Sequence, residues 1–210
     1  MSEAALKLAR LKDYLRGLGS VAIAFSGGVD STFLLKAAHD VLGDKAVAVT
    51  AASVFVPKSE VEEAKTFCAD EGIRQIVFTA DVLAIDGVAQ NPVDHCYLCK
   101  RGLFTRIKAL AEANGLAHVA EGSNMDDLGD YRPGLKAITE LKIESPLRRA
   151  ELYKSEIREL SRAMNLPTAD KPSFACLASR FVYGETISVE KLAMVERAED
   201  LLRGKCFKQF

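Results

Sequence analysis

A short polar loop near the N-terminus carries the residues best suited to binding a phosphate. The apolar run of residues 21–25 ends in Ser-Gly-Gly-Val-Asp-Ser, and residues 32–42 then follow helical spacing. Glycine backbone and the amides at a helix N-terminus can wrap an anion, and hydroxyl groups can donate to the same oxygens. The pattern predicts a nucleotide-phosphate site made by six residues: Ser26, Gly27, Gly28, Asp30, Ser31 and Thr32.

The carboxylate in this loop needs a reason of its own, because it would repel phosphates. Asp30 fits such a loop if it also binds Mg²⁺, which prefers carboxylate and phosphate oxygens. We therefore expect Asp30 to be a magnesium ligand with a catalytic role. The alternative is a plain strand-to-helix turn capped by Asp30 or Ser31. No GxxxxGK[ST] phosphate loop occurs in the chain.

A second polar stretch follows the predicted strand at residues 117–121. Its residues 122–127 should leave the sheet at the same edge as the first loop, so both should face one ligand. Gly122 and Asp126 are expected to contact the nucleotide or its metal, and Arg132 belongs to a turn over residues 130–134 that could touch the nucleotide or a second substrate. An Asx-rich surface turn is the alternative.

Three cysteines form a candidate metal site. Cys96 and Cys99 stand at i and i+3 near a predicted helix start, and Cys176 lies in a turn-rich segment. Zinc would normally require a fourth ligand, for which His95 is the nearby candidate, whereas a [4Fe-4S] cluster held by three thiolates leaves one iron open. Arg180 could pair with a substrate carboxylate or phosphate, or be a solvated arginine.

The remaining two cysteines are expected to have no role at this site. Cys68 lies within an amphipathic helical pattern and Cys206 near the end of the sequence. We interpret both as packing or incidental residues.

The order of the predicted elements indicates an α/β fold. Strands at residues 46–51, 75–79 and 117–121 alternate with helices, which predicts a parallel sheet with helices on both faces. A helix over residues 150–164, a turn-rich stretch and a helix over residues 188–202 follow. We expect two parts, residues 1–146 with the nucleotide site and residues 147–210, smaller and mostly helical.

Charge and hydropathy narrow the possible partners. Lys and Arg total 28 against 29 for Asp and Glu, a net charge of -1, so a nucleic-acid partner is not favoured. No apolar run has the length of a membrane span, and the N-terminus predicts an amphipathic helix with Leu8, Leu11, Leu15 and Leu18 rather than a signal peptide. We expect a cytoplasmic protein with reduced cysteines.

The first loop also resembles a known motif. AFSGGVDST is similar to the PP-loop of the ATP pyrophosphatase superfamily, whose adenine nucleotide alpha hydrolase-like domains occur in NAD and GMP synthetases and tRNA thiolases. The resemblance implies that ATP is cleaved to AMP and pyrophosphate through an adenylated intermediate.

Three further segments narrow the resemblance. NPVDHCYLCKRGLF, EGSNMDDLGDYRPG and KPSFACLASRFVYGE are similar to the ATP-dependent sulfur transferases of the LarE family, which act in nickel-pincer cofactor biosynthesis. The likeness implies that a carboxylate of a nicotinate-derived pyridinium dicarboxylate mononucleotide is adenylated and that sulfur displaces AMP.

The cysteine pattern bears on the sulfur source. Family members with one cysteine, matching Cys176, sacrifice their own sulfur. Members with three, matching Cys96, Cys99 and Cys176, resemble cluster-dependent enzymes that use sulfide or another sulfur donor. The implied cofactors are therefore ATP, Mg²⁺ and a [4Fe-4S] cluster.

The end of the sequence departs from the family. Members continue past a segment like residues 203–210 into a region that contacts the substrate phosphate and helps form a homo-oligomer. This sequence stops at residue 210, which we interpret as either a truncated or a naturally short form. From the family resemblance we expect a homo-oligomer. A tRNA-thiolating PP-loop enzyme and a nonenzymatic ATP- or zinc-binding module are the alternatives.

Overall fold

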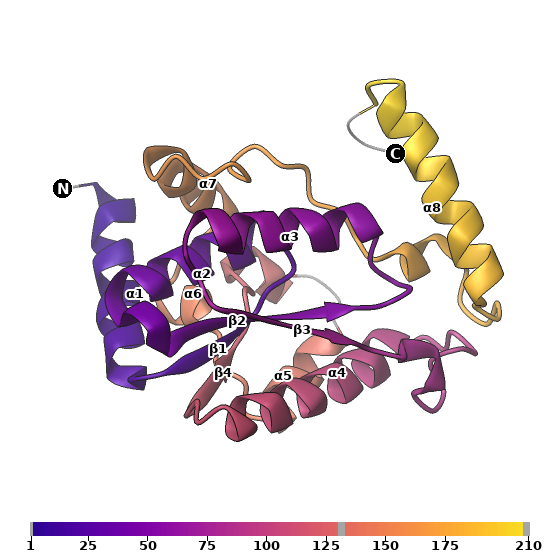
Figure 1. Ribbon diagram of the computed structural model, residues 1–210, viewed down its shortest axis with the longest axis horizontal. Helices are drawn as coiled ribbons and strands as arrows, with labels where there is room; N and C mark the ends of the chain where they lie inside the picture. The colour runs from indigo at the N-terminus through magenta and orange to yellow at the C-terminus, as the bar shows by residue number, and fades with distance from the viewer. Residues whose placement is uncertain (1, 130–132, 208–210) are drawn as a thin grey trace.

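Four parallel strands form the centre of the molecule (Figure 1). The structure is a computed structural model that describes residues 2–129 and 133–207. The strands lie in the order β3-β2-β1-β4, and their bounds are β1 (Val21–Ala24), β2 (Ala46–Ala52), β3 (Gln75–Thr79) and β4 (His118–Ala120). The chain runs outward from β1 to β3 and then returns to the other side of β1. The strand order therefore reverses between β1 and β4, where open α/β sheets bind ligands.

Eight helices and four short 3-10 turns surround this sheet within the described residues. The helices are α1 (Glu3–Leu18), α2 (Val29–Leu42), α3 (Lys58–Asp70), α4 (His95–Ala113), α5 (Gly134–Glu140), α6 (Pro146–Arg149), α7 (Lys154–Ala163) and α8 (Val189–Gly204). The 3-10 turns are η1 (Gly43–Lys45), η2 (Val82–Ala84), η3 (Met125–Gly129) and η4 (Leu177–Arg180).

Alternate strand residues build two cores, one on each face of the sheet. Ile23 packs with α1, α2, α3 and α7, and its neighbour Ala22 packs with α4 and α5. Figure 1 shows α2 and α3 on one side of the sheet and α4 and α5 on the other. This is the layered parallel sheet predicted from the sequence, so the α/β fold class is confirmed.

A third apolar cluster lies beyond the carboxyl ends of the strands. It joins Phe55 after β2, Cys99 of α4, Leu177 of η4 and Leu192 of α8. Helix α8 extends away from the sheet (Figure 1), and Glu196 on it accepts a hydrogen bond from the Lys58 amide at 3.0 Å. Since the N-cap of α3 is a proline with no side-chain acceptor, Glu196 caps α3 from outside.

Three element boundaries differ from the predictions. Helix α2 begins at Val29 rather than at residue 32, so Asp30 lies in its first turn. The helix predicted over residues 150–164 begins only at Lys154, as α7. Glu151 adopts a φ of 58° that interrupts helical backbone after α6, and the Tyr153 amide then donates to Glu156 at 2.9 Å at the start of α7. Helix α5 occupies residues 134–140. The sequence predicted no helix there and assigned only residue 134, to the end of a turn.

None of the helices described between residues 2 and 207 combines the length and the apolar character that crossing a membrane requires.

Helix α7 packs into the main core. Ile157 is fully buried in the same cluster as Phe33 of α2, and Lys7 of α1 donates to Glu156 at 2.8 Å. The division of the chain at residue 146 stays a prediction, and Ile157 offers a way to test it.

We expect Ile157→Ala to lower the free energy of unfolding by about 2–5 kcal/mol, because a large buried side chain leaves a cavity. Unfolding should remain a single transition, since α7 shares its core with α2. Urea denaturation followed by circular dichroism measures both. Leu6→Ala, on the 45% exposed Leu6 of α1, is the control. A separate early transition for the variant would show that α7 unfolds apart from the sheet.

Candidate active site at the carboxyl edge of the sheet

The loop between β1 and α2 is shaped by its own glycines and serines. Gly27 adopts a φ of +72°, and a Cβ there would lie 3.4 Å from the Ala64 Cβ. The Ser31 hydroxyl donates to the Gly28 carbonyl at 3.2 Å and lies 3.1 Å from the Ser26 hydroxyl. Gly28 is the N-cap of α2 and offers no side-chain acceptor, so no side chain caps the amides of the first turn, which suits an anion.

Thr32, the last residue expected to contact phosphate, is fully buried. Its hydroxyl has no hydrogen-bond partner among the described residues, and its amide donates to the Gly28 carbonyl at 2.9 Å. A buried hydroxyl without a partner is uncommon in proteins. The Thr32 hydroxyl is therefore a buried donor without a partner among the described residues, in the turn of α2 that follows the loop.

Asp30 joins three segments of the chain. Its Oδ1 accepts from the Asn124 side-chain amide at 3.3 Å, and its Oδ2 accepts from the Lys154 ammonium at 2.5 Å. Asn124 follows β4 and Lys154 is the first residue of α7. Of these three groups, the Asp30 carboxylate offers the oxygen ligands that Mg²⁺ prefers, whereas the amide and the ammonium donate hydrogen bonds to it.

Sequence reasoning missed Lys154. Lys154 lies in the first turn of α7, where the helix dipole disfavours a cation and an acidic partner offsets it, but the sequence predicted the helix to start at residue 150 and so concealed this position. The partner turns out to be Asp30, which is distant in sequence.

The loop after β4 approaches the first loop closely. A Cβ on Gly122 would lie 3.1 Å from the Ser31 amide nitrogen and 3.3 Å from the Asp30 Cβ. Asp126 accepts from the Lys154 amide at 2.7 Å, and its own amide donates to the Asn124 side chain at 2.9 Å. Gly122 and Asp126 thus lie beside the first turns of α2 and α7, and their contact with a nucleotide or metal stays a prediction. Arg132 and its neighbours 130 and 131 lie outside the described residues.

A buried glutamate holds this second loop. Glu121, 6% exposed, accepts from the Ser123 amide at 3.0 Å and the Ser123 hydroxyl at 2.6 Å. Its other oxygen accepts from Ser145 at 2.6 Å, just before α6. The carboxylate therefore ties β4 to the segment that leads into α6, and it was not identified from the sequence.

A second lysine lies on the other side of the first loop. Lys171 donates to the Gly27 carbonyl at 3.2 Å and to Glu63 of α3 at 2.8 Å. With Lys154, this places two ammonium groups beside the loop of residues 26–31, called the phosphate-type loop below. Neither lysine was among the predicted site residues.

The three candidate cysteines are brought to one neighbourhood. Cys96 and Cys99 lie in the first turns of α4, and Cys176 directly precedes η4, whose Leu177 amide donates to the Phe55 carbonyl at 2.9 Å. Burial and the nearby thiolates of Cys176 and Cys96 raise the pKa of Cys99 to about 12. Burial of the sulfur and the thiolate of Cys96 raise the pKa of Cys176 against the opposing effect of nearby backbone amides and Arg180.

These thiols fit an iron–sulfur cluster in donor type. Over the described residues, however, no three His, Cys, Asp or Glu side chains are gathered closely enough to hold a metal ion. His95, the candidate fourth zinc ligand, is buried with its ring centroid 5.7 Å from that of Phe55, and burial lowers its pKa.

The other cysteines and Arg180 have different surroundings. Cys68 is buried in the main core, and burial raises its pKa to about 12, while Cys206 is exposed. Arg180 donates to Glu199 of α8 at 2.7 Å and to the Ser179 hydroxyl at 2.7 Å. It therefore lies near Cys176, with its guanidinium engaged by a buried carboxylate.

Comparison with known proteins adds relatives over most of the chain, although no family model matches. An uncharacterized protein of Synechocystis sp. is 43% identical over 97% of this chain and 76% of its own length. The pyridinium-3,5-bisthiocarboxylic acid mononucleotide synthase of Lactiplantibacillus plantarum is 37% identical over 99% of this chain and 75% of its own. One component of the glutamine-hydrolyzing GMP synthase of Archaeoglobus fulgidus is 30% identical, over 92% of this chain and 65% of its own.

We expect Gly122→Ala to lower the free energy of unfolding by about 1–3 kcal/mol, because the added methyl meets the backbone of α2. Gly129→Ala is the matched control, since a Cβ there meets nothing within 4 Å. Urea denaturation of the two variants gives the comparison. Equal stabilities would mean that the two loops do not pack as described.

Proposed function

The chain belongs to the family of the pyridinium-3,5-bisthiocarboxylic acid mononucleotide synthase of L. plantarum, and we propose that it is an ATP-dependent sulfur transferase acting on a related pyridinium mononucleotide. The observation that carries the proposal is the convergence, at one edge of the sheet, of a phosphate-type loop with Asp30 and a neighbourhood of three thiols. The loop with Asp30 has groups suited to binding ATP, and the three thiols have groups suited to sulfur transfer.

In the first step, an oxygen of the substrate carboxylate attacks the α-phosphorus of ATP. The bond from that phosphorus to the bridging oxygen of the β-phosphate breaks, and pyrophosphate leaves with the electron pair. Negative charge accumulates on the leaving group, so preorganised donors there accelerate the step. The α2 amides, Lys171 and Lys154 supply positive potential beside the loop.

Asp30 serves the same step through a metal. Magnesium held by Asp30 would neutralise phosphate charge when bound. Asn124 and Lys154 keep the carboxylate turned toward the loop, because each donates to a different oxygen of Asp30. Lys154 is therefore a positioning residue for Asp30.

In the second step, a sulfur nucleophile attacks the carbonyl carbon of the acyl adenylate. The carbon–oxygen bond to the phosphate breaks, AMP leaves, and a thiocarboxylate remains. Sulfide, already at the required oxidation level, supplies the sulfur without an oxidant. A [4Fe-4S] cluster held by Cys96, Cys99 and Cys176 would supply an iron that no protein thiolate occupies.

A different sulfur source is the protein itself. Cys176 could lose its sulfur by cleavage of its Cβ–Sγ bond, with the Cα proton lost, leaving dehydroalanine. This route consumes the chain in one turnover and makes Cys96 and Cys99 dispensable. The two routes differ in stoichiometry, which an experiment can measure.

Asp30→Asn should reduce pyrophosphate release by about 100-fold or more, because it removes the charge that binds the metal. The assay supplies MgATP and pyridinium-3,5-dicarboxylate mononucleotide, and a second arm supplies unmodified tRNA, on which we expect no AMP adduct. Asp44→Asn, at an exposed aspartate just past the far end of α2, is the control. Wild-type release by Asp30→Asn would remove its assigned role, and sulfur in tRNA but not in the mononucleotide would replace the proposed acceptor.

Anaerobically reconstituted protein should be brown and bind about four irons per chain, as a [4Fe-4S] centre requires. Replacing Cys96, Cys99 or Cys176 with Ala should remove the iron, whereas Cys68→Ala and Cys206→Ala should retain it. Iron analysis and visible absorption measure this, and product counting with added sulfide should exceed one sulfur per chain. An iron-free protein that carries dehydroalanine at position 176 after one turnover would instead support the sacrificial route.

A further inference from the structure

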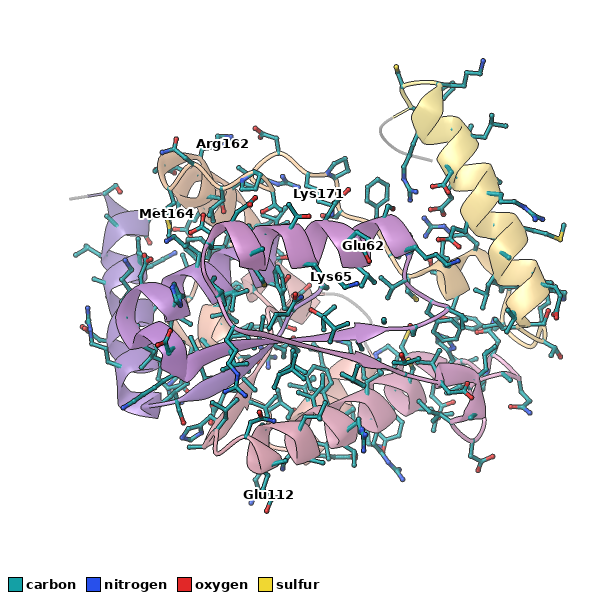
Figure 2. All side chains as sticks on the ribbon, in the orientation of Figure 1. Glu62, Lys65, Glu112, Arg162, Met164 and Lys171 are labelled. Atoms are coloured by element: carbon teal, nitrogen blue, oxygen red, sulfur yellow. The ribbon has the colours of Figure 1, made fainter. Side chains whose placement is uncertain are left out.

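Lys171 connects the phosphate-type loop to the segment that carries Cys176. Its ammonium contacts the Gly27 carbonyl at 3.2 Å and Glu63 at 2.8 Å, and Figure 2 shows Lys171 beside α3. The Lys171 side chain is 18% exposed and that of Glu63 is 62% exposed. The lysine is thus held against the loop, while its acidic partner lies largely in solvent.

The two groups that Lys171 now contacts, the Gly27 carbonyl and the Glu63 carboxylate, bind its ammonium weakly. A solvent-exposed carboxylate contributes little to an ion pair, and a carbonyl oxygen carries no formal charge. Phosphate oxygens held by the loop would offer a charge-assisted hydrogen bond, which is stronger and shorter. Burial raises the pKa of the nearby Glu60 carboxyl, and the charge of Lys171 opposes that rise.

The other end of the segment is fixed. Leu177 is buried in the third apolar cluster, and its amide donates to the Phe55 carbonyl at 2.9 Å. Residues 172–176 therefore run between the phosphate-type loop and the thiol neighbourhood without helix or strand. Five residues span at most about 17 Å, so the position of Lys171 limits where Cys176 can lie.

We propose that Lys171 binds the outer phosphates of ATP and thereby orders the segment 172–176, so that Cys176 is held in place when ATP is bound. This inference rests on the proposed function, because it requires ATP at the loop. Lys171 is a positioning residue for the sulfur step and a ligand of the leaving pyrophosphate. The ammonium exchanges Glu63 for phosphate, and no bond other than hydrogen bonds is made or broken.

The test compares two magnesium-bound nucleotides on the full chain. α,β-Methylene-ATP has the outer phosphates but cannot be cleaved, and AMP lacks them. In the wild type, α,β-methylene-ATP should slow amide hydrogen exchange in residues 173–176 and AMP should not. Lys171→Ala should weaken α,β-methylene-ATP binding by about 10–100-fold, as expected for a lost charged hydrogen bond, with AMP affinity changed less than about twofold.

At saturating α,β-methylene-ATP, Lys171→Ala should show no slowing of exchange in this segment, and Lys171→Arg should restore part of it. Lys65→Ala is the matched control, since Lys65 lies on α3, contacts Glu62 at 2.7 Å and is 45% exposed; Figure 2 labels both residues. Thermal unfolding checks that each variant is folded.

Two results would overturn the inference while leaving the proposed function intact. One is equal affinity of wild type and Lys171→Ala for α,β-methylene-ATP. The other is equal slowing of exchange in both proteins at saturation, which would mean that the nucleotide itself covers the segment. Failure of the wild type to bind α,β-methylene-ATP at all would instead refute the proposed function, and the inference with it.

Discussion

The site depends on the absence of a side chain at Gly122. Because nothing projects there, the backbone after β4 can lie against the first turn of α2, within 3.1 Å of the Ser31 amide measured from an ideal Cβ position. That approach puts Asn124 in reach of Asp30. The two loops emerge from β1 and β4, the strands between which the chain changes direction, so topology brings them together and the glycine lets them touch.

The third apolar cluster, beyond the carboxyl ends of the strands, positions the segments that carry the three cysteines. The third apolar cluster buries Cys99 and Leu177, so the start of α4 and the segment before η4 share one small core. This core contains fewer large side chains than the main one, and its outer wall, α8, is held also by polar contacts such as Glu196 with the α3 amide. The part of the molecule that carries the three cysteines is therefore built on a smaller apolar core than the part that carries the phosphate-type loop.

The fold and the phosphate-type loop could be predicted because apolar runs, helical spacing and the sequence SGGVDS are local signals. Helix α2 begins three residues before its predicted start, since the glycines conceal where helical backbone begins. Long-range partners could not be predicted: Lys154 and Lys171 lie 124 and 144 residues from their contacts in the loop, and no periodicity links such positions. The three cysteines could be grouped from the sequence, but the packing of Cys99 with Leu177, the neighbour of Cys176, in the third apolar cluster is seen only in the folded chain.

The charges around the phosphate-type loop are compatible with the metal and the anion that the proposed function requires. Each lysine there is paired with a carboxylate from another element, Lys154 with Asp30 and Lys171 with Glu63, and all four side chains retain some exposure. Glu63 is 62% exposed, so its pair with Lys171 is screened by water and a phosphate can replace it at little cost. The Lys154 and Asp30 side chains are only 27% and 23% exposed, and their pair holds the carboxylate in place. If a nucleotide binds at the loop as we propose, the exchange of Glu63 for phosphate would couple its binding to the part of the chain that leads to Cys176.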